Sequence, residues 1–221
     1  MKHMQADKYT IAWFKIADCV SRGEKERALG VYRLLSHSFN DDALSRQLEA
    51  DIYLSCNEQE RAVSLYRQAI EGYKKSKRFV EAAALYEHLI FLLPHDSALK
   101  REIMLCYHEI AHMNAKIYPH FQEWIKDHRN KQAWAVIEHF MQESDYFTPV
   151  VQSTMCHYVI EIFHKTVECH SLIMLCVEKP IKRNNTFEHE QSVLQGFLDN
   201  IRSIDELLFE YACAYLQKVS L

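Results

Sequence analysis

The chain has 221 residues, of which 48% are hydrophobic and 25% are charged, and its formal net charge is -4. This length allows a sizeable buried core, and the acidic balance offers no basic stripe that could displace phosphate counterions, so we expect no nucleic-acid partner. Only four glycines and four prolines leave few turn-forming residues, which favours helices.

The N-terminal segment and the cysteine spacing limit the kinds of protein that this chain can be. The opening segment "MKHMQADKYT" lacks the apolar run of a secretory signal, and no apolar run approaches the length of a membrane span. We therefore expect a cytoplasmic protein without a membrane partner. Seven cysteines are scattered without a C-x-x-C pair, so neither a disulfide framework nor a zinc ribbon is indicated.

The first half repeats a pattern of small and aromatic residues. The clearest segment is "LEADIYLSCNEQERAVSLYRQAI", with small or aromatic residues at Ala50, Tyr53, Ala62, Tyr66 and Ala69. The preceding "FKIADCVSRGEKERALGVYRLL" has Ala17, Val20, Gly23, Ala28 and Tyr32, and Ala28 lies one 34-residue period before Ala62. Both segments resemble a tetratricopeptide repeat (TPR), a helix-turn-helix unit, and the resemblance covers about residues 10–113.

A third match follows at a shorter spacing. In "SKRFVEAAALYEHLIFLLP", Phe79, Ala82 and Tyr86 fit the second helix of a repeat. Ala62 and Ala82 are 20 residues apart, so the helix at about 58–74 must both close the second repeat and open the third. After Pro94, "SALKREIMLCYHEIAHM" resembles the first helix of another repeat.

The second half keeps a helical period while the repeat pattern fades. Apolar spacings of three and four residues predict helices at about 119–128, 131–142 and 149–177, the last either continuous or broken near 169–171. A polar linker at 178–190 precedes a final helix at about 188–218. Its apolar residues form a heptad seam, which indicates either a capping helix or self-association: Leu194, Phe197, Ile201, Ile204, Leu208, Tyr211 and Tyr215.

Together these patterns predict an all-α fold. We expect a TPR-like solenoid of antiparallel helix pairs at 1–116, followed by a helical C-terminal region at 117–221 with a long capping helix. That region would either continue the solenoid or form a small bundle. An ordinary helical bundle with coincidental alanines is the alternative fold.

One segment carries a pattern typical of metalloproteases. His108, Glu109 and His112 have the spacing H-E-x-x-H, which on a helix presents two zinc ligands and a general base. The longer metzincin pattern is absent, because Ala115 and Tyr118 stand where it requires glycine and histidine. A zinc hydrolase that uses this "HEIAH" segment is therefore kept as the alternative function.

A second metal pattern uses some of the same residues. Glu109-x-x-His112 and Glu161-x-x-His164 both match the E-x-x-H pair of di-iron helical bundles. Such a site needs further carboxylates, and the candidates are Glu81, Glu87, Glu138 and Glu143. A repeat register places the two motifs apart, so we expect no metal, no cofactor and no enzymatic activity.

The resemblance implies a binding function. First helices of such repeats line a concave groove that receives a peptide or helix of a partner protein, so we expect an adaptor, scaffold or chaperone. A homo-oligomer through the heptad helix is a further possibility. The groove lacks the Lys, Arg and Asn clamp that holds a carboxylate terminus. Its implied lining is Phe14, Asp18, Arg22, Gln47, Asp51, Leu54, Arg101, Leu105, His108 and Glu109.

Overall fold

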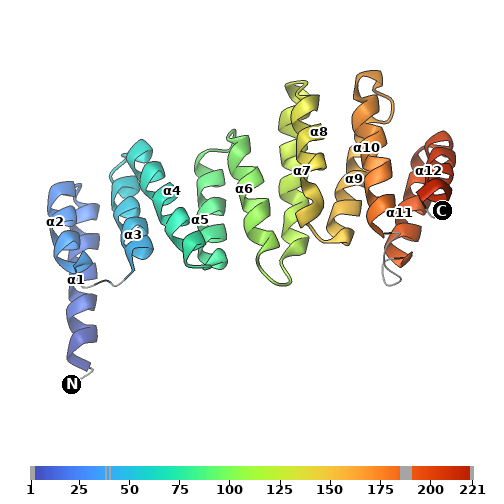
Figure 1. Ribbon diagram of the computed structural model, residues 1–221. Helices are drawn as coiled ribbons and strands as arrows, with labels where there is room; N and C mark the ends of the chain where they lie inside the picture. The colour runs from blue at the N-terminus through green and yellow to red at the C-terminus, as the bar shows by residue number, and fades with distance from the viewer. Residues whose placement is uncertain (1–2, 38, 40, 185–190, 220–221) are drawn as a thin grey trace. The chain divides into compact units, whose positions relative to one another are not determined.

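The computed structural model describes residues 3–37, 39, 41–184 and 191–219. Over these residues the chain forms twelve α-helices and two short 3-10 segments, without a strand, which confirms the predicted all-α fold (Figure 1). No helix in the described ranges has the length and apolar character needed to cross a bilayer. All seven cysteines are free thiols.

The chain divides into two compact units, Met1–Pro94 and His95–Leu221. The boundary expected after residue 116 falls inside helix α7 (Asn114–Asn130) of the second unit. Helix α6 (Ser97–His108) packs against α7, so a segment assigned to the repeats from sequence lies in the second unit.

In the first unit, neighbouring helices in the chain pack against one another (Figure 1). The elements are α1 (His3–Ser21), α2 (Lys25–Ser36), α3 (Asp42–Ser55), α4 (Gln59–Lys75) and α5 (Phe79–Leu92).

One turn recurs between these helices. Gly23, Asn57 and Lys77 each adopt a left-handed φ, between 57° and 71°, directly before the next helix. At each turn the left-handed residue donates its N–H to the carbonyl three residues back. The following residue donates to the carbonyl five residues back, as Glu58 does to Tyr53 (2.9 Å). This is the Schellman motif, which satisfies the last carbonyls of a helix while reversing the chain.

The core of this unit is built from alanines and tyrosines. Ala50, Ala62 and Ala82 are completely buried, which lets the helix backbones approach closely, and the rings of Tyr53 and Tyr66 fill the space between helices. Helices α3 and α4 approach closely at Gly72, where an added Cβ would lie 2.8 Å from the Cβ of Ala43.

Helix α4 packs against both α3 and α5, as the 20-residue spacing predicts. Two successive reversals make α3 and α5 parallel, with their N-terminal ends side by side. The Arg78 guanidinium joins these ends, because it donates to Asp41, the N-cap of α3, and to Glu81 in the first turn of α5 (2.8 Å).

The second unit contains seven helices in its described residues. They are α6, α7, α8 (Trp134–Gln142), α9 (Pro149–Phe163), α10 (His170–Asn184), α11 (Gln191–Ile204) and α12 (Glu206–Val219). The helix expected at 149–177 is two helices, separated by a 3-10 segment at Val167–Cys169. Helix α10 continues through Pro180, so the linker expected at 178–190 is helical as far as Asn184.

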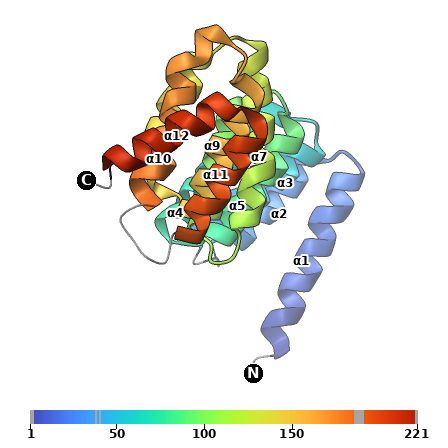
Figure 2. The ribbon, with the colours of Figure 1, turned by 90° about the vertical axis from the view of Figure 1, so that its right-hand side faces the viewer.

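The prediction of a single long C-terminal helix is wrong, because this segment forms two helices. Helices α11 and α12 are separate (Figure 2). Between them lies Asp205, whose carboxylate accepts hydrogen bonds from the backbone N–H groups of Leu207 (2.9 Å) and Leu208 (3.2 Å) and so begins α12. Leu194, Phe197 and Ile201 are buried, and α11 packs against α9, so the heptad seam is neither continuous nor free. The expected start at 188–190 lies outside the described residues.

We expect Gly72→Ala to destabilise the first unit, whereas Gly30→Ala should stabilise it. A methyl group on Gly72 meets Ala43, and such overpacking costs about 1–3 kcal/mol, which outweighs a helix-propensity gain of up to about 1 kcal/mol. A methyl group on Gly30, inside α2, meets nothing within 4 Å. Urea denaturation followed by circular dichroism measures both effects, and equal stabilisation by the two changes would contradict the close helix approach.

Candidate functional site

A pocket of about 300 Å³ opens between α3 and α5 over α4, and we call it the α3–α5 pocket. It exists because the shared helix α4 places two parallel helices on one side of itself. Its lining combines two carboxylates, an amide, a phenol and an imidazole with two apolar side chains: Gln47, Asp51, Tyr66, Glu81, Ala84, Leu85 and His88.

Two tyrosine hydroxyls from α4 hold the polar groups that α3 contributes. Tyr66 donates to Oδ1 of Asp51 (2.5 Å), and Tyr73 donates to Oε1 of Gln47 (2.7 Å). Burial raises the pKa of both phenols, and the Asp51 carboxylate raises that of Tyr66 further, so both hydroxyls remain donors at neutral pH. The carboxylate and the amide are therefore fixed before any ligand arrives.

Helix α5 supplies the opposite wall. The Arg78 guanidinium lowers the pKa of Glu81, which keeps this carboxylate charged. The His88 ring lies edge-on to Tyr66, with 5.1 Å between centroids, and its buried Nε2 has no hydrogen-bond partner in the described part of the chain. The pocket thus has acidic groups on both sides and one imidazole nitrogen without a partner.

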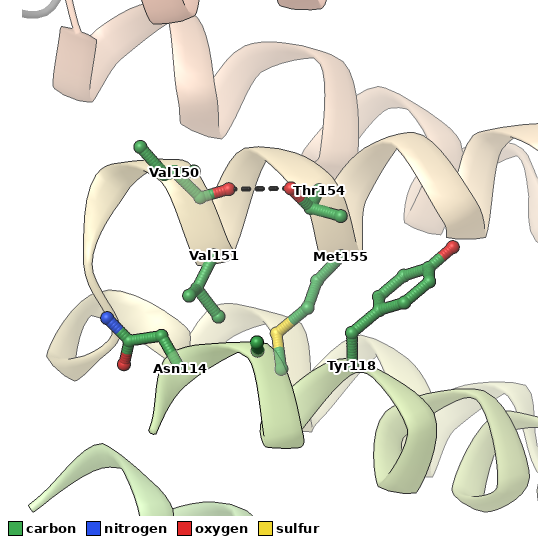
Figure 3. A pocket seen from close by; sticks show the side chains of 7 residues that line it. Asn114, Tyr118, Val150, Val151, Thr154 and Met155 are labelled. Atoms are coloured by element: carbon green, nitrogen blue, oxygen red, sulfur yellow. Dashed lines mark hydrogen bonds between the residues drawn. The ribbon is translucent and has the colours of Figure 1, made fainter. Parts of the chain in front are cut away.

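A second pocket, of about 330 Å³, lies between the first turns of α7 and α9, and we call it the α7–α9 pocket. Figure 3 shows Val151 and Met155 of α9 pointing toward α7, with Tyr118 at one end and Asn114 at the other. The Thr154 hydroxyl donates to the Val150 carbonyl (2.8 Å), so it is satisfied within α9. This pocket can hold an apolar side chain but offers little polar chemistry.

The predicted groove residues of the first unit separate into two groups. Gln47 and Asp51 line the α3–α5 pocket together. Phe14 of α1 is 71% exposed, and Asp18 of α1 forms an exposed ion pair (2.9 Å) with Arg22, which follows that helix. These three, and the half-buried Leu54 of α3, are not among the residues that line either pocket.

The predicted groove residues of the second unit have different surroundings. Arg101 lines a third pocket, described below. Leu105 is half-buried. His108 ends α6 with its ring 5.7 Å from Phe147, and Glu109 is the exposed C-cap of that helix.

Glu81 and His88 are not among the groove residues predicted from the sequence, because the predicted groove draws only on the segments that form α1, α3 and α6. The signal was present in the 20-residue spacing. A helix shared by two pairs places its second neighbour parallel to its first, and residues 81, 85 and 88 of α5 then face residues 47 and 51 of α3.

The protease geometry of "HEIAH" is not formed. Helix α6 ends at His108, and His112 has a left-handed φ of 67° in the following turn. The two imidazoles are therefore not one helical turn apart, which the zinc site of H-E-x-x-H requires. Within the described residues no group of three or more His, Cys, Asp or Glu side chains is arranged to hold a metal ion.

The di-iron pattern is not assembled either. Glu109 lies beyond the end of α6, and Glu161 is exposed on α9. His164 follows the last residue of α9, and its Nδ1 lies 3.2 Å from the Ile160 carbonyl. One E-x-x-H segment thus lies beyond the end of α6 and the other spans the end of α9, whereas a di-iron site needs both segments within the helices of a bundle.

The chain matches no protein-family model and no curated protein sequence. The resemblance to TPR proteins consequently rests on the alanines, tyrosines and spacings given above, and it stays a prediction.

We expect the chain, purified without chelator, to contain far less than one zinc or iron per molecule. The reason is that the H-E-x-x-H residues lie across a helix end and a turn. Elemental analysis by mass spectrometry gives the metal content, with a His108→Ala, His112→Ala double variant as the control. One equivalent of metal that disappears in this variant would show that the segment rearranges into a metal site.

Proposed function

We propose that the chain is a non-enzymatic protein-interaction module, an adaptor, scaffold or chaperone, that binds a peptide or helix of a partner protein. The α3–α5 pocket carries the proposal. It brings together pre-organised polar groups from two parallel helices. Helical repeat proteins typically bind their partners on surfaces of this kind. We place this activity in the cytoplasm.

The arrangement of polar groups supports binding of a positively charged side chain there. Asp51 and Glu81 stand on opposite walls, and a pocket of about 300 Å³ has room for one long side chain. Because Asp51 and Gln47 already accept tyrosine hydrogen bonds, little side-chain freedom is lost when a ligand binds.

The α7–α9 pocket supports the same proposal within the second unit. Its lining is almost entirely apolar, and Val150 at its rim is 57% exposed. Interaction surfaces combine such apolar pockets, which anchor a partner side chain, with polar groups that set specificity.

The test is a selection of peptides from a random display library on the immobilised chain, followed by affinity measurement by calorimetry. We expect Asp51→Lys to weaken basic peptides at least tenfold, about 1.4 kcal/mol, because it reverses a charge inside the pocket. Asp51→Asn keeps an acceptor for Tyr66 and should have a smaller effect.

Glu60→Lys provides the matched control, since it makes the same charge change at an exposed position on α4 outside the pocket. It should alter affinity less than about twofold. If the selected peptides respond equally to both lysine variants, or to neither, then the α3–α5 pocket is not the binding site.

A further inference from the structure

The third pocket lies in the second unit between α6 and α8 over α7, and we call it the α6–α8 pocket. Its volume is about 200 Å³. Where the α3–α5 pocket carries carboxylates, this one carries basic and aromatic groups. Those used below are Ser97, Arg101, Trp124, His128, His139 and Phe140.

Arg101 has unused hydrogen-bonding capacity. Its Nε is buried and has no acceptor among the described residues, and its Nη2 lies a long 3.4 Å from Oε2 of Glu143. A guanidinium presents five donors in a fixed fork, and a buried donor without an acceptor is destabilising. An oxyanion that reached this fork would remove part of that destabilisation.

His128 is a buried polar group in the same wall. The residue is only 8% exposed, and its Nδ1 lies 2.8 Å from the Trp124 carbonyl oxygen. A carbonyl can only accept, so Nδ1 carries the hydrogen and Nε2 of the neutral ring is an acceptor; the ring therefore shapes the wall, while Arg101 supplies the donors for an oxyanion. The ring also packs against Trp124, tilted by 40° with 4.1 Å between the ring centroids, which restricts its orientation.

The start of α6 adds positive potential. Ser97 is the first residue of this 12-residue helix, whose dipole favours anions at that end. Asp96 uses its carboxylate to cap the Ala98 N–H (3.0 Å), and Ser97 is one of the residues that line the pocket.

Glu143 occupies the rim and neutralises the basic groups weakly. It lies 3.4 Å from Arg101 and 3.6 Å from Nε2 of His139, and all three side chains are 43–65% exposed. Charge-assisted hydrogen bonds are usually about 2.7–2.9 Å long, and exposed ion pairs contribute little to stability. Another carboxylate can therefore replace Glu143 at little cost.

We infer that the α6–α8 pocket binds the carboxylate of an Asp or Glu side chain presented by the partner, which displaces Glu143. The inference rests on the proposed function for the source of that side chain. A carboxylate fits better than a phosphate, because Glu143 and Asp96 repel a dianion more strongly than a monoanion. Trp124 and Phe140 form apolar walls for the methylene groups.

The experiment titrates the full chain with capped glutamate, N-acetylglutamic acid amide, and follows the Arg101 Nε–H, Trp124 indole and His128 ring signals by NMR. We expect saturable shifts with a dissociation constant of roughly 1–10 mM. Capped glutamine, which has the same shape without the charge, should cause none. Inorganic phosphate should bind more weakly than capped glutamate.

Two variants give opposite expected results. Glu143→Gln removes the competing carboxylate and should tighten glutamate binding at least threefold, whereas Arg101→Gln should abolish the shifts. Glu161→Gln, at an exposed position on α9, is the matched control and should change nothing. Unchanged affinity in Glu143→Gln, equal shifts with glutamine, or phosphate binding without glutamate binding would each overturn the inference.

This test is independent of the peptide selection. Glutamate binding that depends on Arg101 would stand even if no peptide used the α3–α5 pocket, in which case only the proposed function falls. Conversely, peptides that bind through Asp51 while capped glutamate fails to bind would remove the carboxylate site alone.

Discussion

The repeated left-handed turn is the constraint on which the first unit depends. Gly23, Asn57 and Lys77 reverse the chain within three residues and close the same two hydrogen bonds each time. Because the reversal is so short, the two helices that each turn joins have to pack against each other, and two successive turns return α5 to the side of α3. Gln132 makes the same turn between α7 and α8 in the second unit.

This geometry explains where the pockets occur. The α3–α5 and α6–α8 pockets each lie between two helices that share one neighbour, so side chains from alternate helices meet over the middle one. In both cases the middle helix orders part of the lining. Tyr66 and Tyr73 of α4 hold residues of α3, and within α7 the Trp124 carbonyl holds the ring of His128. These groups are thereby held by hydrogen bonds that need no ligand.

The sequence predicts much of this fold, because small and aromatic residues at helical spacing leave few other ways to bury them. The dual role of α4 followed from the distance between Ala62 and Ala82. The end of α6 could not be predicted, since Ala111 and Glu109 are good helix formers and no glycine follows His108. Asp205 was equally ambiguous, because the heptad spacing continues across it while its carboxylate caps a new helix. The α6–α8 pocket also needs residues of α8, and no local sequence pattern shows that this helix lies beside α6 across α7.

The contact between Gly72 and Ala43 restricts which residues these two positions can accept, whereas the pocket residues are not restricted in this way. The two positions limit how closely α3 and α4 approach, and neither is among the residues that line the three pockets described above. As related chains diverge, we expect positions 43 and 72 to change together, with total volume nearly constant. Asp51, two turns further along α3, is under no such restriction. The charge of the ligand that the pocket prefers can therefore change during evolution while the spacing of α3 and α4 stays the same.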